Sequence, residues 1–307
     1  IVFEFPELQG IMGGKYLKNE GFSEDVCLAV AEHYLPSFYK DALPSSKYGA
    51  IVSVADKIET LISIFISGKR PSGSSDPYAL RRNLNGVIKI IWDYELDLPL
   101  EKLFNELIDF WKIEFPNLDF SKKEVLNDLI EFLVQRIVSH LEEISLSKEL
   151  IKALYSSDEF SQKRILNIVD LKNRVKSIVN FKEKETFFEI QKVITRVSKL
   201  ANSSNLSTEV LSIGDYVNTK LFEKDCELKV FEFIKELEKL YSKGSCDYLK
   251  LLNLFEININ TIEDLFDNEK GVLVMTEDIK VRNNRLNLLS LIRNYSLKIA
   301  DFTLLNS

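Results

Sequence analysis

The chain has 307 residues, of which 45% are hydrophobic and 28% are charged, and its formal net charge is −7. This composition is that of a globular protein with a sizeable core, and no apolar run approaches the ~18 residues that a membrane-spanning helix needs. The acidic balance weighs against a general nucleic-acid binder but leaves room for a local basic patch, because charges are screened beyond ~8–10 Å.

Apolar residues in the first half recur at the 3.6-residue spacing of amphipathic helices. Residues 48–65 fit this spacing well, with Ile51, Ile58 and Leu61 predicted to face the core. Ser121 and Glu124 form a capping box at the start of another helix. The predicted helices of this half are 1–20, 23–34, 48–65, 77–94, 101–111, 122–140 and 147–155.

Three glycines interrupt the first predicted helix. Gly10, Gly13 and Gly14 are poor helix formers. Two interpretations stay open. Either the helix ends at these residues, or a second helix packs closely over them.

The second half is also helical, but it is more polar and richer in lysine and glutamate. Residues 186–201, 216–243 and 278–300 predict helices, whereas residues 253–261 are predicted to form a loop. The alternation that is typical of strands is nearly absent, so the predicted fold class is all-α. We place a domain boundary near residue 165, after a polar stretch.

A loop followed by a helix start occupies residues 68–82. Two glycines, Pro71 and three serines disfavour regular structure in its first part. Asp76 suits the N-cap of the following helix, and Pro77 suits its first position. Four cations gather at this junction: Lys69, Arg70, Arg81 and Arg82.

These cations have two open interpretations. Arginine suits phosphate groups, because its guanidinium donates two parallel hydrogen bonds. Arg81 and Arg82 suit equally well ion pairs with acidic residues of neighbouring helices. A second basic stripe lies in the helix 186–201, where Lys192, Arg196 and Lys199 share one face.

Side chains that could carry catalysis are sparse. His33 and His140 are isolated, so they supply neither a catalytic triad nor the paired His-Asp ligands of a metal-dependent phosphohydrolase. Asp56 and Glu59 lie three residues apart on one predicted helix and would suit an acid–base pair. We favour the interpretation that Asp56 and Glu59 are simply solvated carboxylates.

Nucleotide and disulfide chemistry also lack support. Gly68-Lys69 is not part of a P-loop pattern, and no strand precedes it, so ATP binding by this chain is unsupported. Cys27, Cys226 and Cys246 are odd in number and far apart in the sequence. They predict free thiols in a reducing cytosol.

The stretch 68–82 resembles a family signature without a gap. It is similar to the Gly-x-x-Pro-x-Gly-x-x-Asp-Pro-Phe-Ala-Leu-Arg-Arg run of the bacterial glycyl-tRNA synthetase beta subunit, with Tyr78 in place of Phe. The segment Arg196-Val197-Ser198-Lys199 looks like the family's "KRVSN" run. Further stretches that resemble the family in the same order are Phe5–Gly13, Ala55–Leu61, Val281–Leu286 and Ile299–Leu305.

The resemblance covers nearly the whole chain and implies two domains. An HD-like helical domain would cover residues 1–165, and a DALR-type anticodon-binding domain of helical-bundle form would cover residues 166–307. Because the chain opens at Ile1 within a motif, we interpret it as lacking an N-terminal part. The family's HD-like domain carries no metal set, which agrees with the two isolated histidines.

The resemblance also implies a function and partners. The chain would be the tRNA-binding, non-catalytic portion of a glycine–tRNA ligase beta subunit in the cytoplasm, assembled with alpha subunits as two alpha and two beta chains. Catalysis, with ATP and magnesium, would belong to the alpha subunit, so no catalytic residue, metal or cofactor is expected in this chain. The candidate contacts to glycine tRNA are Lys69, Arg70, Arg81, Arg82, Lys192, Arg196, Lys199, Arg282 and Arg285.

Two points qualify these candidates. The family's usual Lys before Asp-Pro is Ser75 here, and its loop cations have moved to Lys69 and Arg70. Arg285 shares a helix face with Leu289 and Ile292, so packing or a buried ion pair is an alternative role for it. The alternative functions are a helical adaptor without RNA contact and, less favoured, an HD-type phosphohydrolase.

Overall fold

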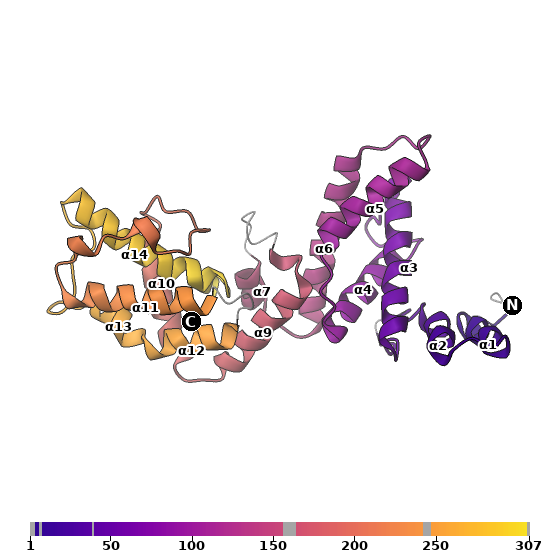
Figure 1. The fold of residues 1–307 in the computed structure, drawn as a ribbon, viewed down its shortest axis with the longest axis horizontal. Coiled ribbons are helices and arrows are strands. Elements are labelled where there is room, and N and C mark those ends of the chain that lie inside the picture. The colour runs from indigo at the N-terminus through magenta and orange to yellow at the C-terminus, as the bar shows by residue number, and fades with distance from the viewer. Residues whose placement is uncertain (1–3, 6–7, 39, 156–163, 242–246, 306–307) are drawn as a thin grey trace. The chain divides into compact units, whose positions relative to one another are not determined.

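A computed structural model describes residues 4–5, 8–38, 40–155, 164–241 and 247–305 (Figure 1). No β-strand occurs in these ranges, so the all-α prediction is confirmed. None of the described helices is long and apolar enough to cross a membrane. The chain forms two compact units, which we call unit 1 (residues 1–146 and 158–171) and unit 2 (residues 147–157 and 172–307).

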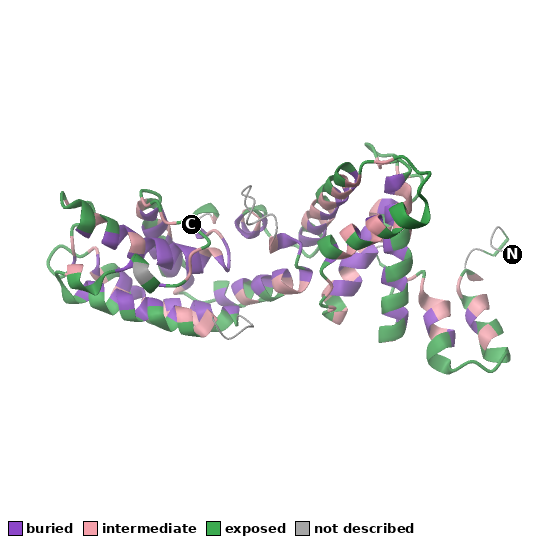
Figure 2. Ribbon diagram, turned by 45° about the horizontal axis from the view of Figure 1, so that its top comes forward, coloured by how far each residue is buried: buried purple, intermediate pink, exposed green. Residues whose placement is uncertain are grey.

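Unit 1 is a set of amphipathic helices around a core made by α3, α4, α5 and α6. Ile62, Leu84, Phe104 and Leu133 are completely buried there, and Figure 2 shows the alternation of buried and exposed faces along these helices. The helices are α1 (Ile11–Asn19), α2 (Glu24–Glu32), α3 (Lys47–Ile66), α4 (Leu80–Tyr94), α5 (Leu100–Glu114) and α6 (Lys122–Glu143). The helix α9 (Ile168–Lys182) begins in unit 1 and continues in unit 2.

The glycines of the first helix serve close packing. α1 continues through Gly13 and Gly14 and lies against α2. A Cβ atom on Gly14 would lie 2.6 Å from the carbonyl oxygen of Cys27 and 2.8 Å from the Cβ of Ala31. Of the two open interpretations, the second is therefore correct for Gly13 and Gly14.

Most of the predicted face of α3 is buried, including Ile58 and Leu61. The start of the helix differs: Ile51 is 49% exposed, whereas the polar residues Ser53 and Lys57 are buried. The segment that follows α2 packs on this face, and its carbonyl groups need donors. Ser53 Oγ donates to Leu35 O over 2.5 Å, and Lys57 Nζ donates to Tyr34 O over 3.0 Å. These hydrogen bonds, which apolar periodicity does not register, account for the burial of Ser53 and Lys57.

Unit 2 is organised around α14, which is buried over most of its length and contacts α10 and α11. Leu288, Leu289 and Ile292 on α14 are completely buried. The α-helices are α7 (Lys148–Leu154), α10 (Phe187–Ala201), α11 (Asp225–Tyr241), α12 (Tyr248–Ile257), α13 (Ile259–Asp264) and α14 (Ile279–Leu297). Short 3-10 turns are η2 (Gly214–Tyr216), η3 (Thr219–Leu221) and η4 (Phe302–Leu304).

The prediction of a loop at residues 253–261 is wrong. These residues form the end of α12 and the start of α13, with a break at Asn258. Phe255, Ile259 and Ile262 are buried on the side that faces the unit's core. Burial of these three side chains outweighs the low helix propensity of the intervening asparagines.

Candidate functional site

The loop between α3 and α4 is closed by Asp76. Its carboxylate accepts hydrogen bonds from the backbone N–H groups of Leu80 (2.8 Å) and Arg81 (3.0 Å). α4 begins at Leu80 and not at Pro77. A turn precedes it, in which the backbone N–H of Ala79 donates to Asp76 O over 3.1 Å. The predicted N-cap position is therefore wrong, because the N-cap residue is Ala79, although the Asp76 side chain still accepts the first two N–H groups of α4.

Two of the four cations near this loop hold the loop in place. Arg70 forms an ion pair with Asp128 of α6, with Nε and one terminal nitrogen each 2.8 Å from the carboxylate, and its guanidinium lies 4.2 Å from the centre of the Phe65 ring. Arg81 donates to the carbonyl oxygens of Gly73 (2.9 Å) and Ser75 (3.3 Å). These contacts tie the loop to α6 and α4.

The other two cations are exposed. The Lys69 ammonium lies 4.8 Å from the centre of the Tyr78 ring and bonds to its hydroxyl, and the Arg82 guanidinium lies 5.1 Å from the centre of the Phe38 ring. A hollow of about 270 Å³ between the loop and the start of α4 is lined by Lys69, Arg70 and Tyr78, among others. Cations beside aromatic faces at a surface hollow suit a ligand with phosphate and planar groups.

The second basic stripe lies on α10. Lys192, Arg196 and Lys199 are all exposed and line one pocket of about 360 Å³. The wall opposite them is the C-terminal segment, which Gln191 holds through a 2.6 Å hydrogen bond from Nε2 to Leu305 O. The Arg196 guanidinium lies 4.2 Å from the centre of the Phe266 ring. The predicted stripe is therefore one continuous cationic surface beside a hollow.

Arg282 and Arg285 have different environments on α14. The Arg285 side chain is 2% exposed, and its guanidinium donates to Glu227 (2.8 Å), Glu223 (2.6 Å) and the carbonyl oxygen of Leu273 (3.0 Å). Arg282 is half-buried, and one of its terminal nitrogens is 3.4 Å from Thr276 O. Of the roles that the sequence left open for Arg285, the structure supports the buried ion pair.

Groups that could carry acid–base or metal chemistry are dispersed. Asp56 and Glu59 are both exposed on α3. His33 contacts Val30 O through Nδ1 over 2.7 Å, while His140 is buried with its ring edge-on to Trp92 at 5.0 Å. Among the described residues, no group of three or more His, Cys, Asp or Glu is placed to hold a metal ion. Cys27 and Cys226 are buried free thiols, and Cys246 lies outside the described ranges.

The His140 ring is expected to remain neutral well below pH 6. Burial, and to a lesser extent the charge of Lys89, lowers its pKa to about 4. Its ring resonances in an NMR titration should therefore move near pH 4, whereas the urea-unfolded chain should titrate near the ordinary value of ~6.5. Between these values the unfolded chain binds the extra proton, so acidification through this window lowers stability. A midpoint near 6.5 in the folded chain would contradict this environment for His140.

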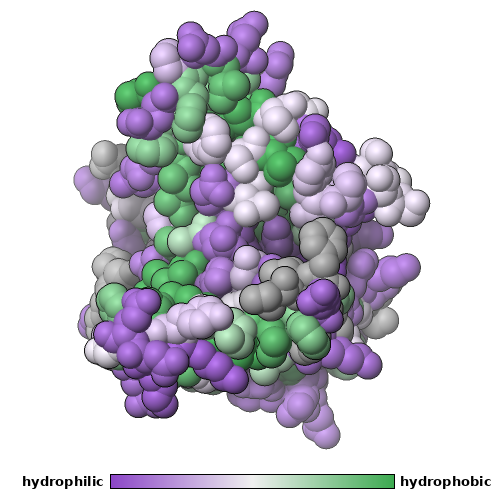
Figure 3. All heavy atoms as spheres, turned by 90° about the vertical axis from the view of Figure 1, so that its right-hand side faces the viewer, coloured by the Kyte–Doolittle hydropathy of each residue, from purple (hydrophilic) through white to green (hydrophobic). Residues whose placement is uncertain are grey.

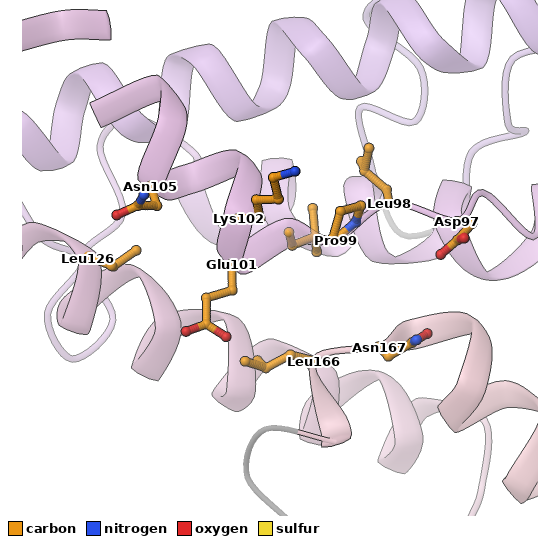
Figure 4. Close-up of a pocket in the computed structure, with 10 residues that line it drawn as sticks. Asp97, Leu98, Pro99, Glu101, Lys102, Asn105, Leu126, Leu166 and Asn167 are labelled. Carbon is orange, nitrogen blue, oxygen red and sulfur yellow. The ribbon is translucent and has the colours of Figure 1, made fainter. Parts of the chain in front are cut away.

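A larger cavity lies in unit 1. It measures about 460 Å³ and lies between the start of α5, α6 and the start of α9 (Figure 4). Glu101 extends from α5 toward Leu166, and the other polar side chains on its wall are Asp97, Lys102 and two asparagines. Among the described residues that line it there is no Ser, Thr, Cys or His, so these residues place no hydroxyl or thiol nucleophile beside an imidazole base.

Sequence reasoning missed two basic residues of unit 1. Lys57 is buried on α3 although the charged residues beside it, Asp56 and Glu59, are exposed. Arg136 on α6 lies near Arg81, outside any stretch of clustered charge. The only signal for Arg136 was its position eight residues after Asp128, which places both on one side of α6.

Comparisons with known proteins agree with one another. A family model described as "Glycyl-tRNA synthetase beta subunit" matches residues 1–156. The chain is 35% identical over 307 residues to a protein of Trichodesmium erythraeum named "Glycine--tRNA ligase beta subunit", with 98% of this chain and 42% of that protein covered. A protein of the same name from Thermodesulfovibrio yellowstonii is 36% identical over 305 residues, with 99% of this chain and 41% of that protein covered. The chain thus spans about two fifths of the length of these relatives.

Proposed function

We propose, from the premise that this chain belongs to the glycyl-tRNA synthetase beta subunit family, that it is a tRNA-binding, non-catalytic portion of a glycine–tRNA ligase. Residues 1–165 act as the HD-like domain and residues 166–307 as the DALR-type anticodon-binding domain. The chain works in the cytoplasm with an alpha subunit, as two alpha and two beta chains. ATP and magnesium are used by the alpha subunit, and this chain supplies binding surface for glycine tRNA.

The observation that carries the proposal is the cationic pocket of unit 2. Three exposed cations, Lys192, Arg196 and Lys199, line one hollow in a chain whose net charge is −7. Like charges repel one another in the free protein, so a cluster of this kind favours a polyanionic ligand. Arg196 beside the Phe266 ring adds a flat surface on which an unpaired base can stack.

Unit 1 offers a second, smaller surface. Lys69 and Arg82 are exposed beside Tyr78 and Phe38, while Arg70 and Arg81 brace the loop that carries them. We assign phosphate contact to Lys69 and Arg82, with Arg70 as a positioning residue. Arg285 is left out of this assignment, because burying it between Glu223 and Glu227 leaves no donor at the surface.

The test is binding of the 307-residue chain to a glycine tRNA transcript across a range of salt concentrations. Arg82→Ala should weaken binding and reduce the slope of log affinity against log salt by about 1, the value for one lost phosphate contact. Lys102→Ala is a matched control in the same unit, because Lys102 is exposed and forms only a 3.7 Å pair with Glu106. An unchanged salt slope in Arg82→Ala counts against this contact.

An anticodon-swapped transcript tests the role of unit 2. Tighter, salt-sensitive binding of the native transcript supports an anticodon reader, and Arg196→Ala should reduce that preference. Equal and weak binding of both transcripts would instead favour the adaptor function. In that case recognition of tRNA depends on the alpha subunit or on parts of the relatives that this chain does not cover.

One observation favours the adaptor as a second candidate. The N-terminal end of unit 1 exposes apolar side chains among charged ones (Figure 3). Tyr48, Ile51 and Val52 on α3 are 60%, 49% and 41% exposed. Phe22, which comes just before α2, and Val26 on α2 are exposed as well. An apolar surface of this kind is typical of contact with another protein chain. A chain that binds the alpha subunit but shows no affinity for RNA would establish this function in place of the first.

A further inference from the structure

We propose that Asp128 of α6 is a positioning residue for RNA binding, which holds Arg70 so that the neighbouring Lys69 meets a phosphate group. This inference rests on the proposed function, and it adds a residue that lies outside the signature stretch 68–82. Asp128 is not among the described residues that line the hollow beside Lys69, so it acts on the ligand through Arg70.

The first observation is the ion pair that joins the loop to α6. Arg70 Nε donates to Asp128 Oδ2 over 2.8 Å, and one terminal nitrogen of Arg70 is also 2.8 Å from this oxygen. Phe132 lies one turn after Asp128, and its ring centre is 5.5 Å from that of Phe65 at the end of α3. Because residues i and i+4 share a helix face, α6 presents the carboxylate to the loop and the ring to α3 from the same side.

The second observation is that Arg70 has little left for a ligand. Its other terminal nitrogen donates to Phe65 O over 2.5 Å and to Lys69 O over 3.0 Å. With one N–H on Nε and one on the nitrogen that faces Asp128, four of the five N–H groups are used within the chain. The guanidinium also lies 4.2 Å from the centre of the Phe65 ring. Arg70 is therefore a brace between α3, α6 and the loop, and not itself a phosphate contact.

The third observation is that this brace holds the residue that faces the ligand. Lys69 is exposed, and its carbonyl oxygen accepts one of the Arg70 hydrogen bonds, which fixes its backbone beside the brace. The Lys69 ammonium bonds to the Tyr78 hydroxyl, and both side chains line the hollow of about 270 Å³. A lysine that is held before binding loses less entropy when a phosphate arrives.

A carboxylate beside an RNA contact has two opposed effects. It repels phosphate, so its removal should strengthen RNA binding if charge alone matters. It also holds Arg70, so its removal should release Lys69 and weaken binding if Asp128 positions the loop. The side chains of Arg70 and Asp128 are 28% and 46% exposed, and a pair of this exposure contributes little to the stability of the whole unit. The direction of the change in affinity therefore separates positioning from charge.

The experiment measures binding of glycine tRNA by Asp128→Ala, Asp128→Glu and the wild-type chain at several salt concentrations. Asp128→Ala should bind about fivefold more weakly, with a salt slope smaller by about 1, as expected for Lys69→Ala. Asp128→Glu keeps the carboxylate and should recover much of both quantities. Lys69→Ala combined with Asp128→Ala should bind no more weakly than Lys69→Ala alone, because both changes act on one contact. Additive losses would contradict this.

Asp109→Ala is the matched control in the same unit. Asp109 of α5 pairs with Lys122 over 2.6 Å, and these side chains are 48% and 31% exposed, close to the values for Asp128 and Arg70. The change removes the same charge and a similar ion pair, but one that does not involve the loop. Asp109→Ala should therefore bind RNA at least as tightly as wild type.

A second measurement tests the brace without RNA. Trypsin cleaves after Lys69, whereas the bond after Arg70 resists it because Pro71 follows. Cleavage at an exposed loop depends on local opening, so releasing the loop should speed it. The rate of cleavage at the Lys69–Arg70 bond, followed by mass spectrometry, should be several-fold higher in Asp128→Ala and unchanged in Asp109→Ala.

The two measurements separate this inference from the proposed function. RNA affinity and salt slope in Asp128→Ala that equal or exceed those of wild type overturn the inference and leave the proposed function standing. If the wild-type chain does not bind RNA, the proposed function fails. Cleavage that is faster only in Asp128→Ala would then overturn the assignment to RNA and leave a brace for another ligand, and equal cleavage in all chains would overturn the brace itself.

Discussion

Replacing Arg285 with methionine should lower the free energy of unfolding of unit 2 by about 3–5 kcal/mol. The reason is that the change leaves Glu227, which is completely buried, without its 2.8 Å partner. Glu227 also accepts the backbone N–H groups of Glu223 (2.7 Å) and Lys224 (3.0 Å) at the start of α11. The Arg285 ion pair therefore joins the first turn of α11 to the central helix α14.

The measurement is urea unfolding followed by two signals. Far-UV circular dichroism reports on helices of both units, whereas both tryptophans, Trp92 and Trp111, lie in unit 1. Arg285→Met should shift the circular dichroism transition and leave the transition seen by tryptophan fluorescence close to that of wild type. The control is Arg282→Met on the same helix, which loses only a 3.4 Å contact to Thr276 O.

A double variant shows whether the uncompensated charge is the cause. Adding Glu227→Gln to Arg285→Met removes the unpaired carboxylate and should recover part of the loss. If Arg285→Met destabilises unit 2 no more than Arg282→Met does, the buried ion pair contributes little and this account of α14 is wrong.

Raising the pH from 8 to 10.5 should stabilise the wild-type chain by about 3 kcal/mol relative to Lys57→Met. Burial lowers the pKa of Lys57 to about 8 from 10.5, although the neighbouring Asp56 carboxylate opposes this. Below pH 8 the ammonium is charged in both states, and burying it penalises the folded state. Between pH 8 and 10.5 the unfolded chain binds the extra proton, so the stability of the folded chain rises with pH until the amine is neutral in both states.

Methionine is the suitable replacement because it is unbranched and has no charge. It also removes the hydrogen bonds to Tyr34 O and His33 O, which the amine can donate whether it is charged or neutral. This loss therefore changes the free-energy difference between the two chains by a similar amount at each pH and has little effect on how that difference varies with pH. The measurement is the urea midpoint from tryptophan fluorescence, which reports on unit 1, at several values between pH 7.5 and 10.5. A difference between wild type and Lys57→Met that does not change with pH would show that Lys57 keeps an ordinary pKa.

The side chain of Lys57 packs against Gly86 of α4. A Cβ atom on Gly86 of α4 would lie 3.0 Å from Lys57 Cε, so α4 leaves just enough room for the lysine stem. The methylene groups of Lys57 thus pack in the core, and its amine donates hydrogen bonds to the carbonyl oxygens of His33 and Tyr34, just after the end of α2.

Local patterns in the sequence determined most of the helices and their ends. Ser121 and Asp278 cap α6 and α14 through side chains that accept N–H groups within the next three residues. Such contacts depend only on residues within one turn, so a reader of the sequence can find them. The two basic groups at residues 69–82 and 192–199 were visible for the same reason, because each is a short run or a regular spacing on one helix.

Only the tertiary structure decided what each cation does. Arg70 and Arg285 are both paired with carboxylates 58 positions away, at Asp128 and Glu227, while Lys192 and Lys199 stay exposed at a pocket. Lys57 is buried because carbonyl groups from the segment after α2 lie above it. The sequence gives the charge of each side chain directly. Its partner depends on which helices, far apart in the sequence, pack together, and the local spacing of residues does not predict that packing.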